Sequence, residues 1–262
     1  MPRISAYIIA FNEADKIEAA LRSVLWADEI IVADSFSTDA TVEIARRYTD
    51  RVIQVPFEGF GKLRNRVLQE LTGDWVFSLD SDERCTVAAA DEIRRVAADP
   101  GACDAYLVPR RNYVFGRWMR HSGYFPDYRQ PQLFRRGRLR YTEDAVHETY
   151  VLDGSLGVLR EPIAQVPFRN LAQMLFKMQR YSTLGVERLE QRAVAPSMWA
   201  ALLHASASFL RHYVFKLGVL DGWAGFVIAL ANFEGTFYRY AKHLEQQRGL
   251  VREPTLPHSF RE

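Results

Sequence analysis

Cysteine is scarce in this sequence, with Cys85 and Cys103 the only two among 262 residues. Their spacing fits neither a disulfide framework nor a cysteine-based metal site, so the pattern predicts a protein of the reducing cytoplasm. A signal-peptide pattern is also missing at the N-terminus, and no run of about 18 or more uninterrupted apolar residues occurs. These absences predict a cytoplasmic chain without a membrane-spanning helix.

Glycine-rich phosphate-binding motifs are absent as well. The sequence contains no Gly-x-Gly-x-x-Gly and no Gly-x-x-x-x-Gly-Lys-Ser/Thr pattern. The hypotheses of a dinucleotide-binding protein and of a P-loop protein therefore lose their main support.

Residues 105–140 hold nine arginines and a single acid, Asp127. Because a guanidinium group matches phosphate and carboxylate, we expect this stretch to face an anionic ligand. No helix-turn-helix, zinc-finger or RNA-binding signature accompanies it, which argues against nucleic acid.

Strand-like and helical segments alternate along the first hundred residues. Strands are predicted at residues 4–10, 29–34, 51–56, 75–80 and 105–111. Helices are predicted between them, with caps at Asn12, at Ser37 or Thr38, and at Thr86. This alternation predicts an α/β fold with a mostly parallel, doubly wound sheet flanked by helices. An irregular stretch follows, and a helical extension is predicted from residue 170 to about 248, with an apolar stripe at Leu171, Leu175, Met178, Tyr181 and Leu184.

Two acids, Asp80 and Asp82, end the apolar run at residues 75–80. A buried parallel strand would release both acids at its carboxyl edge, where open α/β sheets bind ligands. Mg²⁺ or Mn²⁺ is typically held there by one or two carboxylates together with substrate phosphates. The pair therefore predicts a metal–diphosphate site, although acids in a loop are often simply solvated. Two further strand ends, at residues 10–13 and at Asp34, are expected on the same edge.

At this point the motifs resemble those of a known family. Residues 8–13 (IIAFNE), 31–39 (IVADSFSTD) and 79–82 (LDSD) resemble successive motifs of family 2 inverting glycosyltransferases with a GT-A fold. Four later segments resemble the lipopolysaccharide core β-1,4-glucosyltransferase subgroup: residues 59–62 (GFGK), 121–127 (HSGYFPD), 144–148 (DAVHE) and 218–222 (GVLDG). The resemblance extends to about residue 245. Ser35 and Phe36 depart from it, because the family more often has a second acid or small residue and a glycine there.

The resemblance implies roles for residues of the donor half. It assigns Asp34 to the uracil or ribose of a UDP-sugar, with Phe11 and Glu13 lining the same pocket; a helix cap is the alternative for Asp34. Lys62 and Arg64 would pair with the nucleotide or its phosphates, or lie on a solvated helix face. Asp80 would approach the ribose or the metal, and Asp82 would coordinate Mg²⁺ or Mn²⁺, which offsets charge on the departing UDP.

An inverting transfer also needs a general base for the acceptor hydroxyl. Residues 142–144 match the Thr-Glu-Asp form that often carries this base in the family, so Asp144 is the first candidate and Glu148 the second; a surface acidic pair is the alternative. His147 would complete the metal shell or contact the diphosphate, unless it is a structural histidine.

The acceptor is expected to meet aromatic side chains among the arginines, namely Trp118, His121, Tyr124 and Phe125, unless these form a small local core. Ten aromatics at residues 199–240, interleaved with Arg211, Lys216, Arg239 and Lys242, suit a helical surface on an anionic bilayer. Helix packing or a homo-oligomer interface would use the same residues.

The sequence therefore predicts a nucleotide-sugar-binding half at residues 1–112, an acceptor-binding and catalytic segment at 113–168 and a helical extension at 169–262. We expect a metal-dependent enzyme, peripheral at the inner face of the cytoplasmic membrane, that moves a hexose from UDP to a lipopolysaccharide inner-core sugar or another lipid-linked glycan. Glucose as the hexose rests on the family analogy. A polyprenyl-phosphate glycosyltransferase, a nucleotidyltransferase and a non-catalytic docking protein are the competing hypotheses.

Overall fold

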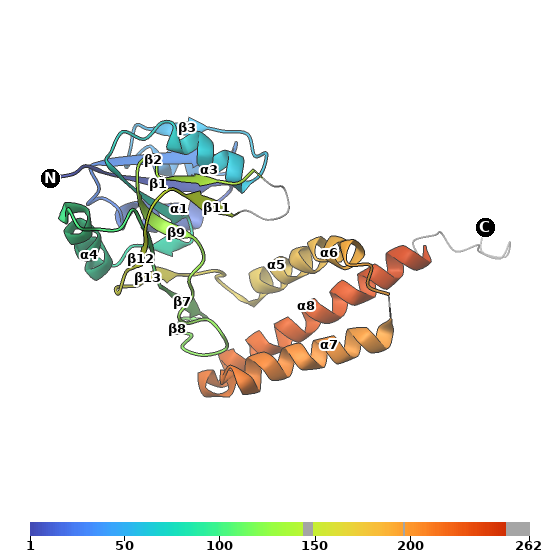
Figure 1. Ribbon diagram of the computed structural model, residues 1–262. Coiled ribbons are helices and arrows are strands. Elements are labelled where there is room, and N and C mark those ends of the chain that lie inside the picture. The colour runs from blue at the N-terminus through green and yellow to red at the C-terminus, as the bar shows by residue number, and fades with distance from the viewer. Residues whose placement is uncertain (144–148, 196, 250–262) are drawn as a thin grey trace, which may run out of the picture. The chain divides into compact units, whose positions relative to one another are not determined.

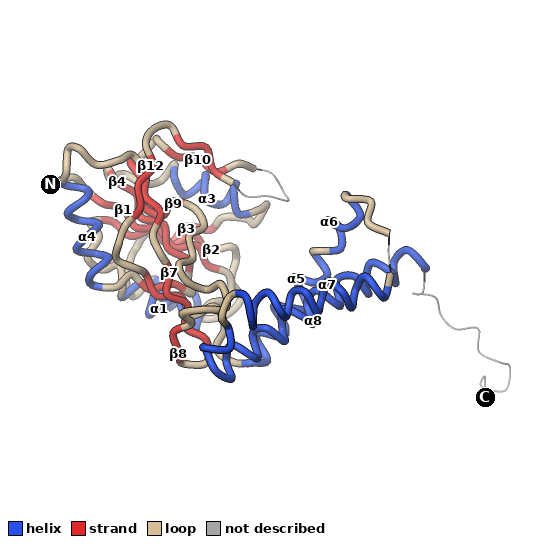
Figure 2. The backbone as a smooth tube through the Cα atoms, turned by 60° about the horizontal axis from the view of Figure 1, so that its bottom comes forward, coloured by secondary structure: helices blue, strands red, loops and turns tan. Residues whose placement is uncertain are grey.

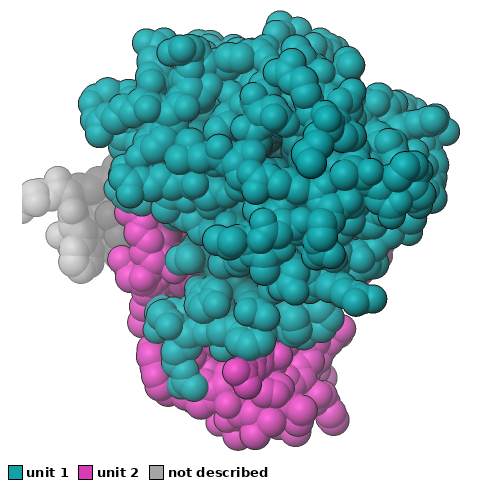
Figure 3. Space-filling model, turned by 90° about the vertical axis from the view of Figure 1, so that its left-hand side faces the viewer, with its two compact units in different colours: residues 1–118, 124–167 teal, residues 119–123, 168–262 magenta. Residues whose placement is uncertain are grey.

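The computed structural model of this chain describes residues 1–143, 149–195 and 197–249. The chain divides into two compact units, which Figure 3 shows in different colours. The first contains Met1–Trp118 and Tyr124–Pro167, and the second contains Met119–Gly123 and Phe168–Glu262. The first unit is built of strands and helices, and the second of helices (Figures 1 and 2).

A seven-stranded mixed sheet forms the centre of the first unit, with the strand order β12-β6-β9-β4-β1-β2-β3. These strands are β1 (Ile4–Ala10), β2 (Glu29–Asp34), β3 (Val52–Gln54), β4 (Trp75–Asp80), β6 (Ala105–Leu107), β9 (Pro131–Arg135) and β12 (Leu156–Val158). β4, β1, β2 and β3 run parallel, whereas β9 is antiparallel to both of its neighbours. The mostly parallel sheet is thus confirmed. The predicted strand at 105–111 is wrong in detail, because it splits into β6 and β7 (Arg110–Val114), which join different sheets.

Helices cover both faces of this sheet because its strands are apolar on both sides. One hydrophobic core contains Ile17 of α1 (Ala14–Arg22), Ala45 of α2 (Thr41–Ala45), Ile93 of α4 (Val87–Ala98) and, between them, Ile8 of β1. The other core contains Leu63 of α3 (Phe60–Leu68) and residues of β10 (Leu139–Tyr141), with β11 (Tyr150–Leu152) packed against it. Successive residues of β1 therefore point into different cores, as the two-residue period of a strand requires.

Helix caps show where local sequence signals succeed and fail. The Thr86 side chain accepts a hydrogen bond from the Ala89 N–H at 3.1 Å and caps α4, as predicted. The predicted caps at Asn12 and at Ser37 or Thr38 are wrong. α1 begins after Glu13 and α2 after Ala40, and neither start has a side-chain cap. The polar side chains that suggested caps instead join the two loops to each other.

A four-stranded sheet lies beside the loop that follows β4. Its order is β5 (Glu83–Arg84), β13 (Ile163–Gln165), β7 and β8 (Arg117–Trp118). In this sheet β13 pairs antiparallel with β5 and parallel with β7. The loop bearing Asp80 and Asp82 is consequently fixed by residues that lie some eighty positions later in the chain.

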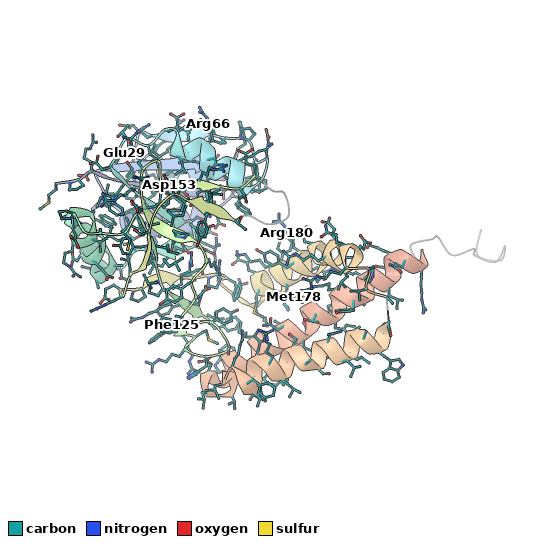
Figure 4. The ribbon with its side chains drawn as sticks, viewed as in Figure 1. Glu29, Arg66, Phe125, Asp153, Met178 and Arg180 are labelled. Carbon is teal, nitrogen blue, oxygen red and sulfur yellow. The ribbon has the colours of Figure 1, made fainter. Side chains whose placement is uncertain are left out.

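The helical unit is arranged around one long helix, α8 (Gly222–Arg248), which packs against α5 (Leu171–Leu184), α6 (Val186–Gln191) and α7 (Met198–Leu210) (Figure 1). Met178 of α5, labelled in Figure 4, lies where a Cβ on Gly235 of α8 would approach its Cγ to 3.1 Å. The helix predicted from residue 170 is confirmed. Its apolar stripe is not the buried face, however, since α5 buries Met174 and Ser182 instead.

The turn between α7 and α8 consists of η1 (Arg211–Phe215) and η2 (Gly218–Asp221). It is tight: a Cβ on Gly225 would overlap the carbonyl oxygen of Gly218, and Leu217 has a φ of 56°. None of the described helices is by itself both long and apolar enough to cross a membrane. Taken together, Met198–Phe215 and Gly218–Arg248, which are bent at their junction, pass the same test on length and composition.

Candidate functional site

The carboxyl ends of three neighbouring strands bring the predicted acids to one edge of the sheet. β1 lies between β2 and β4, with Ala10 paired to Asp34 and Ile9 paired to Asp80. Since adjacent strands lie about 4.8 Å apart, the backbones at Asp34 and Asp80 are separated by about 10 Å. Asp82 follows two residues beyond Asp80. The register therefore produces the predicted common rim.

Asp34 is completely buried and closes the turn that follows β2. Its carboxylate accepts hydrogen bonds from the N–H of Ser37, at 2.8 Å, and from the Ser37 hydroxyl. The Asn12 N–H donates to Ser37 Oγ at 2.8 Å, and Asn12 Oδ1 accepts from the Thr38 N–H at 2.8 Å. The loops after β1 and β2 are thus braced together. For Asp34 to contact a uracil or ribose, as predicted, its hydrogen bonds from Ser37 would have to be replaced by hydrogen bonds from the ligand.

Both loops also hold a residue in the left-handed region, which is uncommon for side chains other than glycine. Asn12 has a φ of 53° and Phe36 a φ of 60°. Such conformations cost free energy and often occur at ligand sites. Phe11 and Phe36 are each 58% exposed at this rim. Two aromatic side chains are therefore available to a planar group.

Asp80 is held by a buried arginine of α3. Arg64 Nη2 lies 2.8 Å from Asp80 Oδ1, while its Nη1 donates to Ser78 Oγ at 3.0 Å and to the Tyr7 hydroxyl at 3.4 Å. Burial alone would raise the pKa of Asp80, but the charge and hydrogen bond of Arg64 outweigh it and lower the pKa below its ordinary value. Asp80 is consequently ionised at neutral pH. Arg64 is itself buried, so any effect on a bound nucleotide would pass through Asp80.

A buried ion pair between Glu83 and Arg110 lies next to the loop that bears Asp80 and Asp82. Glu83 is wholly enclosed, and its carboxylate accepts from Arg110 Nε, from the Asp80 N–H at 2.9 Å and from Gln132 Nε2 at 2.8 Å. Burial raises the pKa of Glu83, with further contributions from the charges of Asp80 and Asp82, against the lowering effect of Arg110. The sequence analysis missed Glu83 and Gln132 because no local pattern marks a buried polar contact between distant strands.

Asp82 is fastened to the small sheet. Its Oδ1 accepts from Gln165 Nε2 at 3.2 Å, and its backbone carbonyl accepts from the Val166 N–H at 2.9 Å. Arg129 Nη2 lies 3.4 Å from Gln165 Oε1 and 3.3 Å from Asp127. A half-buried, anchored carboxylate two residues after an ionised one matches a divalent-cation site in which phosphates supply other ligands. Among residues 1–143, 149–195 and 197–249, no cluster of three His, Cys, Asp or Glu side chains is arranged to hold a metal.

Two other predicted donor residues form local ion pairs. Lys62 Nζ lies 2.9 Å from Glu58, four residues earlier, and both side chains are exposed. Glu13 lies 2.9 Å from the buried Lys16. Lys62 is exposed on its helix, and its pairing with the nucleotide or its phosphates stays a prediction. The pKa of Lys62 is raised, chiefly by its hydrogen bond to Glu58.

The predicted base and histidine, Asp144, Glu148 and His147, lie outside the described residues. The strand leading to them is described, and it is joined to α3. Asn65 Nδ2 donates to the Tyr141 carbonyl, and the Tyr141 N–H donates back to Asn65 Oδ1, both at 2.9 Å. A Cβ on Gly61 would overlap the carbonyl oxygen of Thr142, so only glycine fits there. The same helix therefore holds Asp80 and the chain entering residues 144–148.

Most arginines of residues 105–140 have partners within the chain, and the expectation that the stretch faces an anion stays a prediction. At least six of its nine arginines have partners within the first unit, and Arg129, which pairs with Asp127, is one of them. Arg110 pairs with Glu83, Arg111 lies 4.6 Å from the ring of Trp118, Arg135 lies 4.6 Å from the ring of Trp75, Arg136 donates to Gly73, and Arg138 pairs with Asp153. Sequence counting could not separate these roles because all nine residues are chemically identical.

The aromatic residues predicted to meet the acceptor fall in both units. Trp118 and Phe125 pack edge to face with ring centroids 5.4 Å apart. His121 belongs to the helical unit, where its Nδ1 lies 3.2 Å from Asp221 Oδ1. Asp221 also accepts from the backbone N–H groups of Arg120 and His121 and from the Ser122 hydroxyl. These contacts hold residues 119–123 onto the turn between α7 and α8, and an acceptor role for the aromatic residues stays a prediction.

Comparison with known proteins identifies the family. The model of the family described as Glycosyl transferase family 2 matches residues 5–163, which include the whole strand-end rim. The chain belongs to glycosyl transferase family 2. It is an α/β protein of the GT-A type with a mostly parallel sheet and C-terminal helices, as the resemblance implied.

Two related glycosyltransferases are similar to this family 2 protein over almost its whole length. It is 29% identical to the lipopolysaccharide core biosynthesis glycosyltransferase LpsC of Rhizobium meliloti, over 97% of this chain and 96% of the relative. It is 26% identical to an uncharacterized glycosyltransferase of Rickettsia felis, over 92% and 89% of the two chains. The crystal structure of residues 1–349 of TarS from S. aureus, 14% identical, has a TM-score of 0.51 and covers 97% of this chain and 94% of its own. This last likeness concerns the fold alone.

Proposed function

We propose that this family 2 enzyme transfers a hexose, with glucose the first candidate, from UDP to an inner-core sugar of lipopolysaccharide with inversion at the anomeric carbon. The observation that carries the proposal is the rim formed by Asp34, Asp80 and Asp82 at the ends of neighbouring strands. Similarity to LpsC along 97% of the chain supports the acceptor class.

The donor would lie across the carboxyl ends of β2, β1 and β4. Exposed Phe11 and Phe36 offer apolar faces to a uracil ring. Asp34, buried at the end of β2, would accept a hydrogen bond from the uracil N–H or from a ribose hydroxyl. The bonds between the two loops hold their backbones in place before the nucleotide arrives, which reduces the entropy lost on binding. The bonds from Ser37 to Asp34 would be replaced by bonds from the nucleotide.

Asp80 and Asp82 would hold Mg²⁺ or Mn²⁺ against the diphosphate. When bound, the cation supplies Lewis-acid stabilisation of the charge that develops on UDP. The chain's own part is to present ionised oxygens in fixed positions. Arg64 keeps Asp80 deprotonated, Glu83 fixes the Asp80 N–H, and Gln165 orients the carboxylate of Asp82.

Asp144, with Glu148 as the second candidate, would accept the proton of the attacking acceptor hydroxyl. The acceptor oxygen then bonds to the anomeric carbon while the bond from that carbon to the UDP oxygen breaks on the opposite side. Inversion follows from this single displacement. The attachment of β10 to α3 fixes where the chain enters residues 144–148.

The decisive test is a screen of UDP-sugars with Mn²⁺, with Mg²⁺ and with EDTA, using purified truncated core oligosaccharides as acceptors. We expect metal-dependent release of UDP with one sugar, and a product whose new linkage has inverted configuration by NMR. Release of pyrophosphate instead of UDP would show nucleotidyl transfer. Absence of both turnover and UDP binding would overturn the enzymatic proposal.

Base variants separate hydroxyl acceptors from ionised ones. Asp144→Asn is expected to reduce kcat by about 10²–10⁴-fold, the usual contribution of a general base, and Glu148→Gln to reduce it less. A polyprenyl phosphate acceptor is already ionised, so an enzyme using one would keep most of its turnover in both variants. The two outcomes therefore distinguish lipopolysaccharide from polyprenyl phosphate as acceptor class.

A further inference from the structure

The turn between α7 and α8 exposes a dense group of large apolar side chains. We call residues 211–223 the tip. Six of its residues are between 48% and 79% exposed: Val214, Phe215, Leu217, Val219, Leu220 and Trp223. In a monomeric soluble protein, isolated exposed apolar residues are common, whereas a contiguous set of this kind indicates an interaction surface.

The charge around the tip has one sign. Asp221 is the only acid among residues 192–233, and it is buried under the backbone of residues 119–123. The same stretch contains Arg192, Arg211 and Lys216. Arg211 is exposed within the tip itself. The tip therefore offers solvent an apolar surface accompanied by positive charge and by no exposed acid.

The tip is held rigidly rather than collapsing over its own apolar side chains. Gly225 packs directly on Gly218, and Asp221 binds residues 119–123. In and beside it, the rings of Phe209, Tyr213 and Phe226 pack together with centroids 5.3–5.9 Å apart. Phe226 remains 45% exposed, so this ring cluster does not cover the apolar side chains of the tip, which are left for a partner.

We infer that the tip docks on an anionic lipid surface, with its apolar side chains in the interfacial region and Arg211 at the headgroups. Amphipathic, basic and aromatic helical segments bind membranes in this way. A second copy of the chain is a poorer occupant, because a two-fold contact would place the basic tip against an identical basic tip.

Docking would carry a segment of the acceptor region to the membrane. Residues 119–123 are bound to the tip, and they continue directly into Trp118 on one side and Tyr124 on the other. This step rests on the proposed function, in which the acceptor is anchored in lipid. The docking itself does not depend on it.

Vesicle flotation tests the surface without any reaction. We expect the full chain to float with phosphatidylcholine vesicles containing about 30% phosphatidylglycerol, and to remain soluble with phosphatidylcholine alone or at high salt. The triple variant Phe215→Ser, Leu220→Ser, Trp223→Ser should lose at least about tenfold in vesicle affinity, and Arg211→Glu should lose binding to the anionic vesicles specifically. Phe176→Ser, which removes an equally exposed phenylalanine of α5, is the matched control and should bind normally.

Turnover and size measurements keep this proposal separate from the proposed function. The triple variant should release UDP normally with a soluble truncated acceptor, and should slow only with acceptor embedded in anionic vesicles. Quenching of tryptophan fluorescence by brominated lipid should fall in Trp223→Phe. Failure of the unmodified chain to bind anionic vesicles would overturn the inference. So would equal loss of binding in Phe176→Ser, or a dimer that the triple variant converts to a monomer while neither form binds vesicles.

Discussion

Around Asp80 in the α/β unit, charged side chains are buried and paired, whereas at the tip of the helical unit large apolar side chains are exposed. Glu83 and Arg110 lie against each other with almost no contact with solvent, and Arg64 reaches Asp80 from inside the fold. In the helical unit, Phe215 and Leu220 extend into solvent. Both arrangements cost free energy in an isolated protein.

The difference indicates that the units perform separate tasks. Buried charge is used where a loop must be held in a fixed position, as at Asp80 and Asp82. Exposed apolar surface lies at the tip, where the proposed docking would bury it. Single substitutions of the buried charges should therefore change stability and catalysis. Substitutions of the exposed apolar residues should change docking.

Breaking the buried ion pair should have the largest effect. Arg110→Met leaves Glu83 enclosed without its cation, and we expect the free energy of unfolding to fall by about 3–5 kcal/mol in urea titrations. Arg138→Met, which breaks the exposed pair with Asp153, should cost about 0–1 kcal/mol. Equal losses would remove the distinction between buried and surface charge.

The pH dependence of this variant has a definite sign. Burial already raises the pKa of Glu83 in the folded chain, and loss of Arg110 should raise that pKa further. A group with a raised folded-state pKa is stabilising below that pKa, and this contribution is lost as the pH rises through it. Arg110→Met should therefore recover stability as the pH is lowered and lose it as the pH is raised.

Removing the second rim acid should affect chemistry more than stability. Asp82→Asn keeps the shape of the side chain and a hydrogen bond to Gln165 but removes the charge offered to a cation. We expect metal-dependent UDP release to fall by about 10²–10³-fold, consistent with the several kcal/mol that a Lewis acid contributes, with an unchanged unfolding midpoint. Asp91→Asn on exposed α4 is the control. Full activity in Asp82→Asn would place the site elsewhere.

Crowding the tip should weaken the helical unit while leaving the donor site intact. A Cβ at Gly225 would overlap the Gly218 carbonyl, so Gly225→Ala should cost about 1–3 kcal/mol, as overpacking usually does. The substitution Gly235→Ala in the same helix meets only the flexible Met178 side chain and should be close to neutral. Thermal unfolding and UDP binding, measured on both variants, distinguish these outcomes. Loss of UDP binding in Gly225→Ala would contradict separate tasks for the units.

The smallest expected change is a shift in acid titration. Asp80 has a lowered pKa because Arg64 outweighs burial, so its contribution to stability is present above the ordinary value of 3.8 and is lost as the pH falls through the lowered pKa. Arg64→Gln should raise the pKa of Asp80, observed by carbon NMR of its carboxyl group. Arg66→Gln, on the exposed side of α3 (Figure 4), should leave it unchanged. An unaltered titration in Arg64→Gln would show that burial, rather than Arg64, governs Asp80.

Much of the sheet could be predicted because each of its parallel strands is marked by the residues of the strand itself. The strands ending at Ala10, Asp34 and Asp80 are apolar segments separated by helices, and parallel pairing then puts their ends on one edge. The insertion of β9 between β4 and β6 could not be predicted, because β9 comes from the irregular stretch, where no alternation of strands and helices indicates its antiparallel partners. The same holds for the division of the strand expected at 105–111.

The site was predictable only for residues that follow strands. Asp34, Asp80 and Asp82 are marked by their position after apolar runs. Glu83 carries no such mark, because its partners Arg110 and Gln132 come from distant strands. Asn12 and Ser37 were assigned to helix caps because such side chains commonly cap helices, yet here they bind the neighbouring loop.

The nine-residue helix α3 has a consequence for how the reaction could be tuned. Neighbouring residues on one face of it bind Asp80 through Arg64, bind Tyr141 through Asn65 and abut Thr142 at Gly61. In the proposed reaction, this helix would set the spacing between the cation-binding acid and the chain that enters the proposed base. Tilting the helix would then disturb both at once.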